Sequence, residues 1–287
     1  MLYAIIAAVF LLFLTVSVIG GIYMYRFAIV RDKKTPDWWT HPEKLEPPQH
    51  MTPENAAIVT HGRQWILAHA SKPYYRVSRD GVTLACRMIH PTGIWTEQPR
   101  GIVLCCHGYR SHAVFDFAGA AEWLCAEGFS LCLIDQRACG SSGGKYVTFG
   151  VREKDDVVDW ACWLAERYPD LPVLLDGVSM GSSTVLAASD ETLPPNVRAI
   201  VADCGYTSAA GICKKVLRQW FHLPPFPLYY AALCVIWLRA GVWLPDLDCA
   251  DAVTRNRLPL LIAHGKADDF VPFSMGEQLY AAAKDHC

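Results

Sequence analysis

The strongest constraint on the fold is the pentapeptide Gly-Val-Ser-Met-Gly at residues 177–181, which lies between two different kinds of segment. The apolar run 172–175 before it predicts a β-strand, and residues 182–189 after it predict a helix. A serine between glycines at such a junction occupies a sharp, strained turn, and the glycines let strand and helix pack closely. The turn directs the first helical N–H groups toward the atom that the serine attacks. We therefore expect Ser179 to be a nucleophile, although an ordinary small-residue turn could have the same five letters.

Strand and helix signals alternate through most of the chain, which predicts an α/β fold with a mostly parallel sheet covered on both faces. The first two strands are joined by Arg79-Asp80-Gly81, a turn that favours an antiparallel hairpin. Predicted strands cover residues 74–78, 82–89, 101–106, 130–134, 173–175, 198–202 and 259–263, and predicted helices cover 54–72, 115–127, 153–168, 182–189 and 273–284.

The start of the chain differs from the rest, because the segment from Leu2 to Tyr25 contains no charged side chain. As a helix it would be about 36 Å long, enough to cross a hydrocarbon core of roughly 30 Å. A cleaved signal peptide is the alternative, but it needs a charged start and a shorter apolar core. Basic residues follow at positions 26, 31, 33 and 34, opposed only by Asp32. By the positive-inside rule we expect a single-pass membrane protein whose remaining residues lie in the cytoplasm.

Cysteine usage and charge narrow the class of protein further. The chain has 12 cysteines, none of them in a Cys-x-x-Cys pair, and many lie inside apolar runs. This pattern is typical of reduced, buried thiols in the cytosol and not of disulfides or zinc sites, so we expect no metal. The formal net charge is -2 and no basic stripe is present, which argues against a nucleic-acid partner.

We divide the chain into a transmembrane anchor at residues 1–30, a linker at 31–53 rich in proline and charge, and a domain at 54–287. Within the domain, residues 211–257 interrupt the alternation with an aromatic-rich insertion that contains a predicted helix at 228–238. That helix is too short for a second membrane crossing. We expect the insertion to form a helical cap whose aromatic side chains line an acyl or aryl pocket or touch the membrane surface.

Two loops after other predicted strands can approach Ser179. The sequence His-Gly-Tyr-Arg at 107–110 follows a strand, and in such a turn the backbone N–H after the glycine points at the nucleophile. The N–H groups of Tyr109 and Met180 would then form an oxyanion hole. The glycine-rich loop at 135–143 lacks the pattern of a phosphate-binding loop, so we expect it to shape the pocket wall.

A nucleophilic serine also needs a histidine base, and that base needs a carboxylate that fixes its tautomer. Asp268 stands in the loop after the strand 259–263, where such an acid belongs. Asp269 beside it is a near-equivalent alternative. Asp203, after the strand 198–202, is a third candidate.

Four sequences carry a resemblance to a known family: Asp-Gln-Arg-Ala-Cys-Gly at 135–140, Gly-Val-Ser-Met-Gly at 177–181, Ala-Asp-Cys-Gly-Tyr-Thr-Ser at 202–208 and His-Gly-Lys-Ala-Asp-Asp-Phe-Val-Pro at 264–272. From about residue 74 to the C-terminus the chain resembles the α/β-hydrolase superfamily. It is similar to a bacterial branch of membrane-anchored serine hydrolases near the esterases and prolyl-oligopeptidase-type peptidases.

The resemblance implies specific roles for residues of this chain. Ser179 would be the nucleophile and Asp268 the acid, with oxyanion donors at Tyr109 and Met180. The resemblance also implies an eight-stranded, mostly parallel sheet and neither a metal nor an organic cofactor.

The catalytic histidine is where the sequence departs from the family. It is expected one helix and one strand after the acid, but the sequence ends at Cys287. His286 is the sole histidine after Asp268, at the end of the last predicted helix, where no strand carries it back to the serine. His112 and His222 could approach the pocket, but no spacing argues for either. We therefore expect the last strand, the histidine loop and the final helix to be missing from this sequence.

The function that these features favour is hydrolysis of carboxylic esters or thioesters through an acyl-enzyme on Ser179, with a small-molecule ester or acyl substrate. A peptidase or amidase of the same fold is the first alternative. The second is a non-catalytic, membrane-tethered binding module, favoured by the histidine that the sequence does not reveal.

Overall fold

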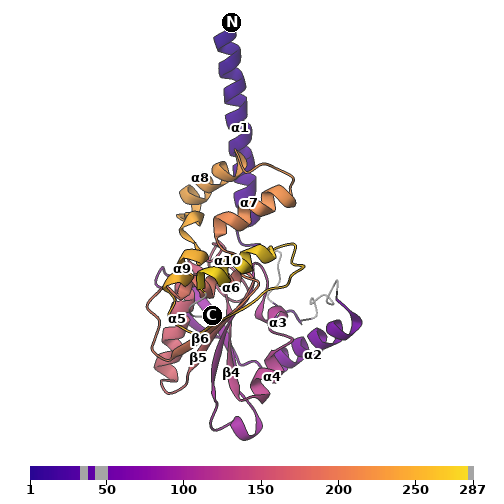
Figure 1. The fold of residues 1–287 in the computed structure, drawn as a ribbon, viewed down its shortest axis with the longest axis vertical. Helices are drawn as coiled ribbons and strands as arrows, with labels where there is room; N and C mark the ends of the chain where they lie inside the picture. The colour runs from indigo at the N-terminus through magenta and orange to yellow at the C-terminus, as the bar shows by residue number, and fades with distance from the viewer. Residues whose placement is uncertain (33–37, 43–50, 284–287) are drawn as a thin grey trace.

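The computed structural model describes residues 1–32, 38–42 and 51–283, and within them the chain forms one seven-stranded sheet (Figure 1). The strand order is β1-β2-β4-β3-β5-β6-β7. The hairpin β1–β2 and the pair β2–β4 are antiparallel, and all other neighbours are parallel, so the predicted α/β fold is confirmed. The strands are β1 (Tyr74–Val77), β2 (Thr83–Ile89), β3 (Gly101–Cys106), β4 (Phe129–Asp135), β5 (Val173–Val178), β6 (Val197–Asp203) and β7 (Leu260–Ala263).

Helices cover both faces of this sheet, and each layer has its own apolar core. On one face, α5, α6, α9 and α10 pack around a cluster that includes Trp160 and Leu186. On the other face, α2, α3 and α4 pack around Ile66 and Phe117. The helices are α1 (Leu2–Ala28), α2 (Pro53–His69), α3 (Ala113–Asp116), α4 (Ala121–Ala126), α5 (Glu153–Arg167), α6 (Met180–Ala188), α7 (Ala209–Gln219), α8 (Leu228–Ala240), α9 (Cys249–Arg255) and α10 (Phe273–Ala283).

One helix expected at 115–127 is divided in two. Helix α3 ends at Asp116, and α4 begins at Ala121. Helix α2 approaches the gap so closely that a Cβ on Gly62 would lie 1.8 Å from the carbonyl oxygen of Ala118. Gly119 in the gap disfavours a continuous helix, and the contact with α2 holds the turn in place.

Helix α1 projects from the domain, and α7 and α8 flank its domain-proximal half (Figure 1). Among the described residues it is the one helix long and apolar enough to cross a membrane, by length and composition. The chain after α1 joins the domain directly, because Val30 forms a bridge with Tyr146 and the N–H of Arg31 donates to the carbonyl of Lys145 at 2.9 Å. The end of α1 is therefore fixed to the loop that precedes α5.

A buried ion pair holds the loop after β4 against α5 and the β1–β2 turn. Arg137 donates from Nε and Nη2 to both carboxylate oxygens of Asp156, at 2.7 and 2.6 Å, and from Nη1 to Asp80 at 2.7 Å. The side chains of Arg137 and Asp156 are 4% and 3% exposed. Removing one partner of such a pair leaves an uncompensated buried charge.

We expect Arg137→Ala to lower the free energy of unfolding by about 3–5 kcal/mol, because Asp156 loses its counter-charge in a buried site. Urea titration of the detergent-solubilised chain at pH 7, followed by circular dichroism, measures this loss. Arg255→Ala is the matched control: Arg255 also pairs with a carboxylate, that of Asp190, but their side chains are 50% and 32% exposed. Its loss should stay below about 1 kcal/mol, and equal losses for the two variants would contradict the expectation.

Candidate active site

Ser179 lies at the junction of β5 and α6 in a backbone conformation that L-residues rarely adopt. Its φ is 56° and its ψ is -114°, and its N–H donates to the carbonyl of Asp203 at 2.8 Å. Non-glycine residues with positive φ carry strain that the surrounding structure must hold, and such strain gathers at functional sites. The serine predicted to occupy a strained turn does so.

The two glycines of the turn are required by backbone packing. A Cβ on Gly177 would lie 2.3 Å from the carbonyl oxygen of Gly181. A Cβ on Gly181 would lie 1.9 Å from the carbonyl oxygen of Cys106, at the end of β3. No side chain fits at either position, so strand, turn and helix meet through their backbones.

The loop after β3 lies against the serine. A Cβ on Gly108 would be 3.3 Å from Ser179 Cβ, and the Gly108 N–H donates to Asp116 Oδ2 at 2.6 Å. The hydroxyl of Ser111 donates to the other oxygen of Asp116 at 2.7 Å. One carboxylate therefore holds the loop at two points. Sequence reasoning missed Asp116, because nothing in its local pattern distinguishes it from an ordinary acid in the first turn of a helix.

Tyr109 and Met180 line the same cavity as Ser179. The position of Met180 follows from the turn, since it is the first residue of α6. Tyr109 is held by its side chain: burial raises its pKa to about 12, and the protonated hydroxyl donates to the carbonyl of Ala28 at 2.8 Å. The role of the two backbone N–H groups as oxyanion donors stays a prediction.

His107 is a structural residue in this arrangement. Its Nε2 accepts from the N–H of Gln136 at 3.0 Å, so the ring proton is on Nδ1, which donates to the carbonyl of Gly108 at 2.8 Å. Burial lowers the pKa of His107, which favours the neutral ring that these two hydrogen bonds require. Both ring nitrogens are engaged in fixing the loop next to the serine.

The structure brings two of the candidate acids to one edge of the sheet. Asp268 Oδ1 accepts from the N–H groups of Phe270 and Val271 at 2.9 and 2.8 Å, while Oδ2 lies 3.7 Å from His264 Nε2. The pKa of Asp203 is raised, mainly by burial. The charge of His264 acts to lower it and that of Asp268 to raise it, so the three side chains interact electrostatically. The backbone donors on Oδ1 fix the carboxylate of Asp268 in one orientation.

Asp269, the near-equivalent candidate, is placed differently from Asp268. Its side chain is exposed, and its backbone carbonyl accepts from the ammonium of Lys215. The assignment of Asp268 as the acid stays a prediction.

No histidine in the described ranges is hydrogen-bonded to Ser179. His264 donates from Nε2 to the carbonyl of Val271 at 2.8 Å, and its Nδ1 faces α10, where a Cβ on Gly276 would lie 2.6 Å away. The side chain of His112 accepts from the N–H of Val114 at the start of α3, and its Nε2 lies 3.1 Å from Asp135 Oδ1. His286 lies outside the described residues.

The cavity beside the serine is apolar. Its volume is about 480 Å³, and it lies between Ser179, the last turns of α1, and helices α7 and α8. Met24, Phe27 and Ala28 of α1 form one wall. The sequence predicted that the insertion at 211–257 lines a pocket, but it did not predict that α1 does. The contact between α1 and the insertion joins segments about 180 residues apart, which no local pattern records.

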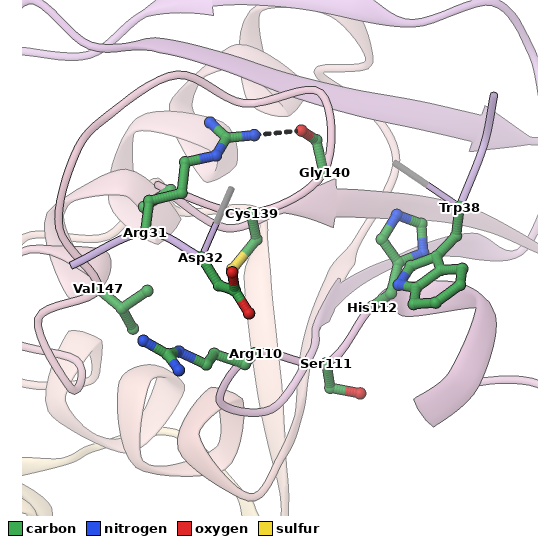
Figure 2. A pocket seen from close by; sticks show the side chains of 10 residues that line it. Arg31, Asp32, Trp38, Arg110, Ser111, His112, Cys139, Gly140 and Val147 are labelled. Carbon is green, nitrogen blue, oxygen red and sulfur yellow. Dashed lines mark hydrogen bonds between the residues drawn. The ribbon is translucent and has the colours of Figure 1, made fainter. Parts of the chain in front are cut away.

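A second recess is polar and much smaller. It has a volume of about 20 Å³, room for a single water, and lies between Arg31, Arg110 and His112 (Figure 2). Figure 2 shows the Arg31 guanidinium reaching the carbonyl of Gly140, a bond of 2.7 Å. Ser179 is not part of its lining. The apolar cavity is therefore the candidate substrate site.

None of the described residues forms a group of three or more His, Cys, Asp or Glu side chains that could hold a metal ion. The described cysteines are free thiols, and most are buried. The chemistry that this arrangement supports is that of a serine at a strained turn beside a preformed loop.

Comparison with known proteins gives a family model and several relatives. The model, described as "Serine aminopeptidase, S33", matches residues 97–223, which contain Ser179 and the loop after β3. An uncharacterized protein of Bacillus subtilis, YqkD, is 27% identical over 185 residues, which cover 64% of this chain and 60% of that protein. A monoacylglycerol lipase of Mycolicibacterium smegmatis is 31% identical over 185 residues, which cover 62% of this chain and 59% of the lipase. The chain thus spans less than two thirds of either relative.

Solved structures with the same fold include an esterase and a peptidase. Esterase Pf2001 of Pyrococcus furiosus has a TM-score of 0.59 at 22% identity, covering 84% of this chain and 85% of the esterase. The acylaminoacyl peptidase of Pyrococcus horikoshii has a TM-score of 0.55 at 15% identity, covering 75% of this chain and 34% of the peptidase. The family model agrees with this likeness of fold, and the chain belongs to the α/β-hydrolase superfamily.

Proposed function

We propose that this protein is a serine hydrolase that cleaves carboxylic ester or thioester bonds through an acyl-enzyme on Ser179. The observation that carries the proposal is the position of Ser179: a strained turn that lies in the wall of an apolar cavity of about 480 Å³. Ligand cavities of roughly 300–1,000 Å³ with few polar groups suit small apolar substrates. An acyl chain in this cavity would bring its carbonyl carbon next to the serine.

The reaction follows from these positions. Ser179 Oγ attacks the carbonyl carbon and loses its proton to a base, and the carbonyl oxygen becomes an oxyanion. We assign the stabilisation of that oxyanion to the N–H groups of Met180 and Tyr109, a contribution of about 3–4 kcal/mol per donor in related chemistry. Collapse expels the alcohol or thiol with the proton from the base. Water then attacks the acyl-enzyme and releases the acid.

We propose that the base is a histidine outside the described residues, because no histidine within them is bonded to Ser179. Asp268 is the carboxylate that would orient it, since its Oδ1 is fixed by two backbone N–H groups. The lack of a histidine bonded to Ser179 among the described residues also favours the competing function, a membrane-tethered binding module that keeps the cavity without turnover. A peptidase remains the alternative within the same chemistry, and relative kcat/KM on p-nitrophenyl esters and aminoacyl amides separates the two.

We also propose that α1 is a retained anchor and that the domain faces the cytoplasm. Arg26 and Arg31 follow the apolar span, as the positive-inside rule requires for a cytoplasmic domain. The end of the span is bonded into the domain: the carbonyl of Ile29 accepts from Val147 N–H at 2.8 Å, and that of Val30 from Arg110 at 2.9 Å. Cleavage after Ala28 would leave these two contacts at a free N-terminus and would remove the bond from the Tyr109 hydroxyl to the carbonyl of Ala28.

The nucleophile is tested by labelling the protein, expressed from its own gene, with a fluorophosphonate probe. We expect the wild-type chain and Ser182→Ala to be labelled and Ser179→Ala not to be labelled. Ser182 is the matched control because it lies on the same helix, α6, but is fully buried. In-gel fluorescence measures the yield. A wild-type chain that resists the probe would refute the hydrolase and leave the binding module.

Asp116→Asn tests the loop beside the serine. The amide oxygen can still accept from the Gly108 N–H and the NH₂ group can donate to the Ser111 hydroxyl, but both bonds lose the charge of the carboxylate and become weaker, so the loop is held less firmly. We expect the labelling rate of Ser179 to fall on the order of 10- to 100-fold, the usual effect of misplacing a catalytic group by about 1 Å. Time-resolved labelling measures the rate, with thermal unfolding as a check on folding. An unchanged rate would show that the Asp116 bonds do not set the site.

The anchor is tested by the mass and the orientation of the chain in bacterial membranes. We expect a chain that keeps α1, resists extraction by alkaline carbonate, and is digested by protease only after the cells are opened. Intact-protein mass spectrometry and protease protection measure these properties. A mature chain that begins after Ala28 would instead identify α1 as a signal peptide.

A further inference from the structure

Helices α1 and α8 pack through small residues and touch backbone to backbone. Ser17 and Gly21, one turn apart, are the two buried residues of α1. A Cβ on Gly21 would lie 2.7 Å from the carbonyl carbon of Ala231, and a Cβ on Gly20 would lie 2.4 Å from the side chain of Leu228. Pairs of small residues four positions apart are typical of helices that associate inside a membrane.

The contact reaches far along α1. The ring of Phe27 lies 5.6 Å from that of Phe221, and the ring of Phe13 lies 6.2 Å from that of Phe226. Phe13 and Phe27 are about 21 Å apart along the helix at 1.5 Å per residue. Since the uncharged segment begins at Leu2, Phe13 lies near the middle of the span. Phe226 is therefore at the depth of the bilayer centre if α1 crosses the bilayer.

The segment that connects α7 to α8 suits that depth. No charged residue occurs between Arg218 and Arg239. The tip of this segment, residues 224–227, contains three prolines, which have no backbone N–H to satisfy in hydrocarbon. At about 20 Å, α8 is too short to cross a hydrocarbon core of about 30 Å, so the hairpin would enter and return on the same side. Its exposed apolar side chains are Trp220, Leu223, Phe226, Tyr230, Trp237 and Leu238.

The cavity at Ser179 lies behind these helices. Phe27 from α1, Val216 from α7 and Ala232 from α8 all line it. Its walls on this side thus include α1 and α8, whose outer faces carry exposed apolar side chains, and the buried side of α7, whose exposed end carries Arg218. An acyl chain that enters between them comes from the hydrocarbon and not from water.

We propose that the α7–α8 hairpin is inserted into the bilayer beside α1 and that the cavity takes the acyl chain of a single-chain lipid ester directly from the hydrocarbon. The inserted hairpin then forms a lipid-facing surface that is continuous with that of α1. The cleavage of the bound ester rests on the proposed function, but the insertion and the binding of the chain do not. The anchor is then a wall of the substrate site as well as a tether.

The insertion is tested by photo-crosslinking the full-length chain in phosphatidylcholine vesicles. A benzophenone amino acid replaces Phe226 at the tip or, as the matched control, Trp123 on α4; their exposed fractions are 66% and 62%. We expect lipid adducts at position 226 at least ten times more often than at position 123. Equal yields at the two positions would overturn the insertion.

The acyl site is tested with a monoacylglycerol probe that carries a diazirine and an alkyne in its chain, added to the same vesicles. We expect adducts on peptides of α1, α7 and α8, reduced at least fivefold by Val216→Trp, which fills the cavity. Gln219→Trp, an exposed position on the same helix, should leave the yield unchanged. If V216W loses its thermal unfolding transition, V216F takes its place. An unchanged yield in a folded cavity variant would overturn the acyl site.

Fluorophosphonate labelling of Ser179 in the same samples separates the two proposals. Lipid adducts at position 226 and in the cavity without labelling of Ser179 would refute the hydrolase but support the inserted hairpin. Labelling of Ser179 without either adduct would support the hydrolase and refute the inserted hairpin.

Discussion

The arrangement of this protein depends on the hydrogen bonds that join the end of α1 to the loops around Ser179. The hydroxyl of Tyr109 donates to the carbonyl of Ala28 at 2.8 Å, and Arg110 donates to that of Val30 at 2.9 Å. Arg31 reaches the loop after β4 in the same way. These bonds fix the last turns of α1 above the serine. The apolar cavity exists because α1 is held there, so the proposed membrane anchor is also a wall of the proposed substrate site.

The sequence predicted the parts of the fold that local chemistry determines. Strand positions follow from apolar runs, and the strained turn follows from Gly177 and Gly181, where an added Cβ would lie only 2.3 and 1.9 Å from backbone oxygens. The position of Asp268 beside a fixed loop follows from the same rule, because the carboxyl ends of parallel strands meet at one edge of the sheet. Each of these features can be read within about ten residues.

The features that the sequence did not reveal depend on contacts between distant segments. Asp116 contributes to the site only because its Oδ2 accepts from the Gly108 N–H at 2.6 Å. The expected helix at 115–127 is divided because α2 packs against Ala118, a contact that no periodicity records. Phe27 lines the cavity only because α7 and α8 fold back onto α1. Tertiary packing decides all three, so propensity and pattern could not.

Ser179 is proposed to form a covalent intermediate with an acyl chain taken up in the cavity beside α1. The most direct measurement is peptide mapping by mass spectrometry after the full-length chain, in vesicles, is mixed with a long-chain p-nitrophenyl ester and quenched in acid. We expect the peptide containing Ser179 to carry the mass of the acyl group and the corresponding peptide of Ser179→Ala to lack it. An acyl group on another residue, or on none, would contradict it.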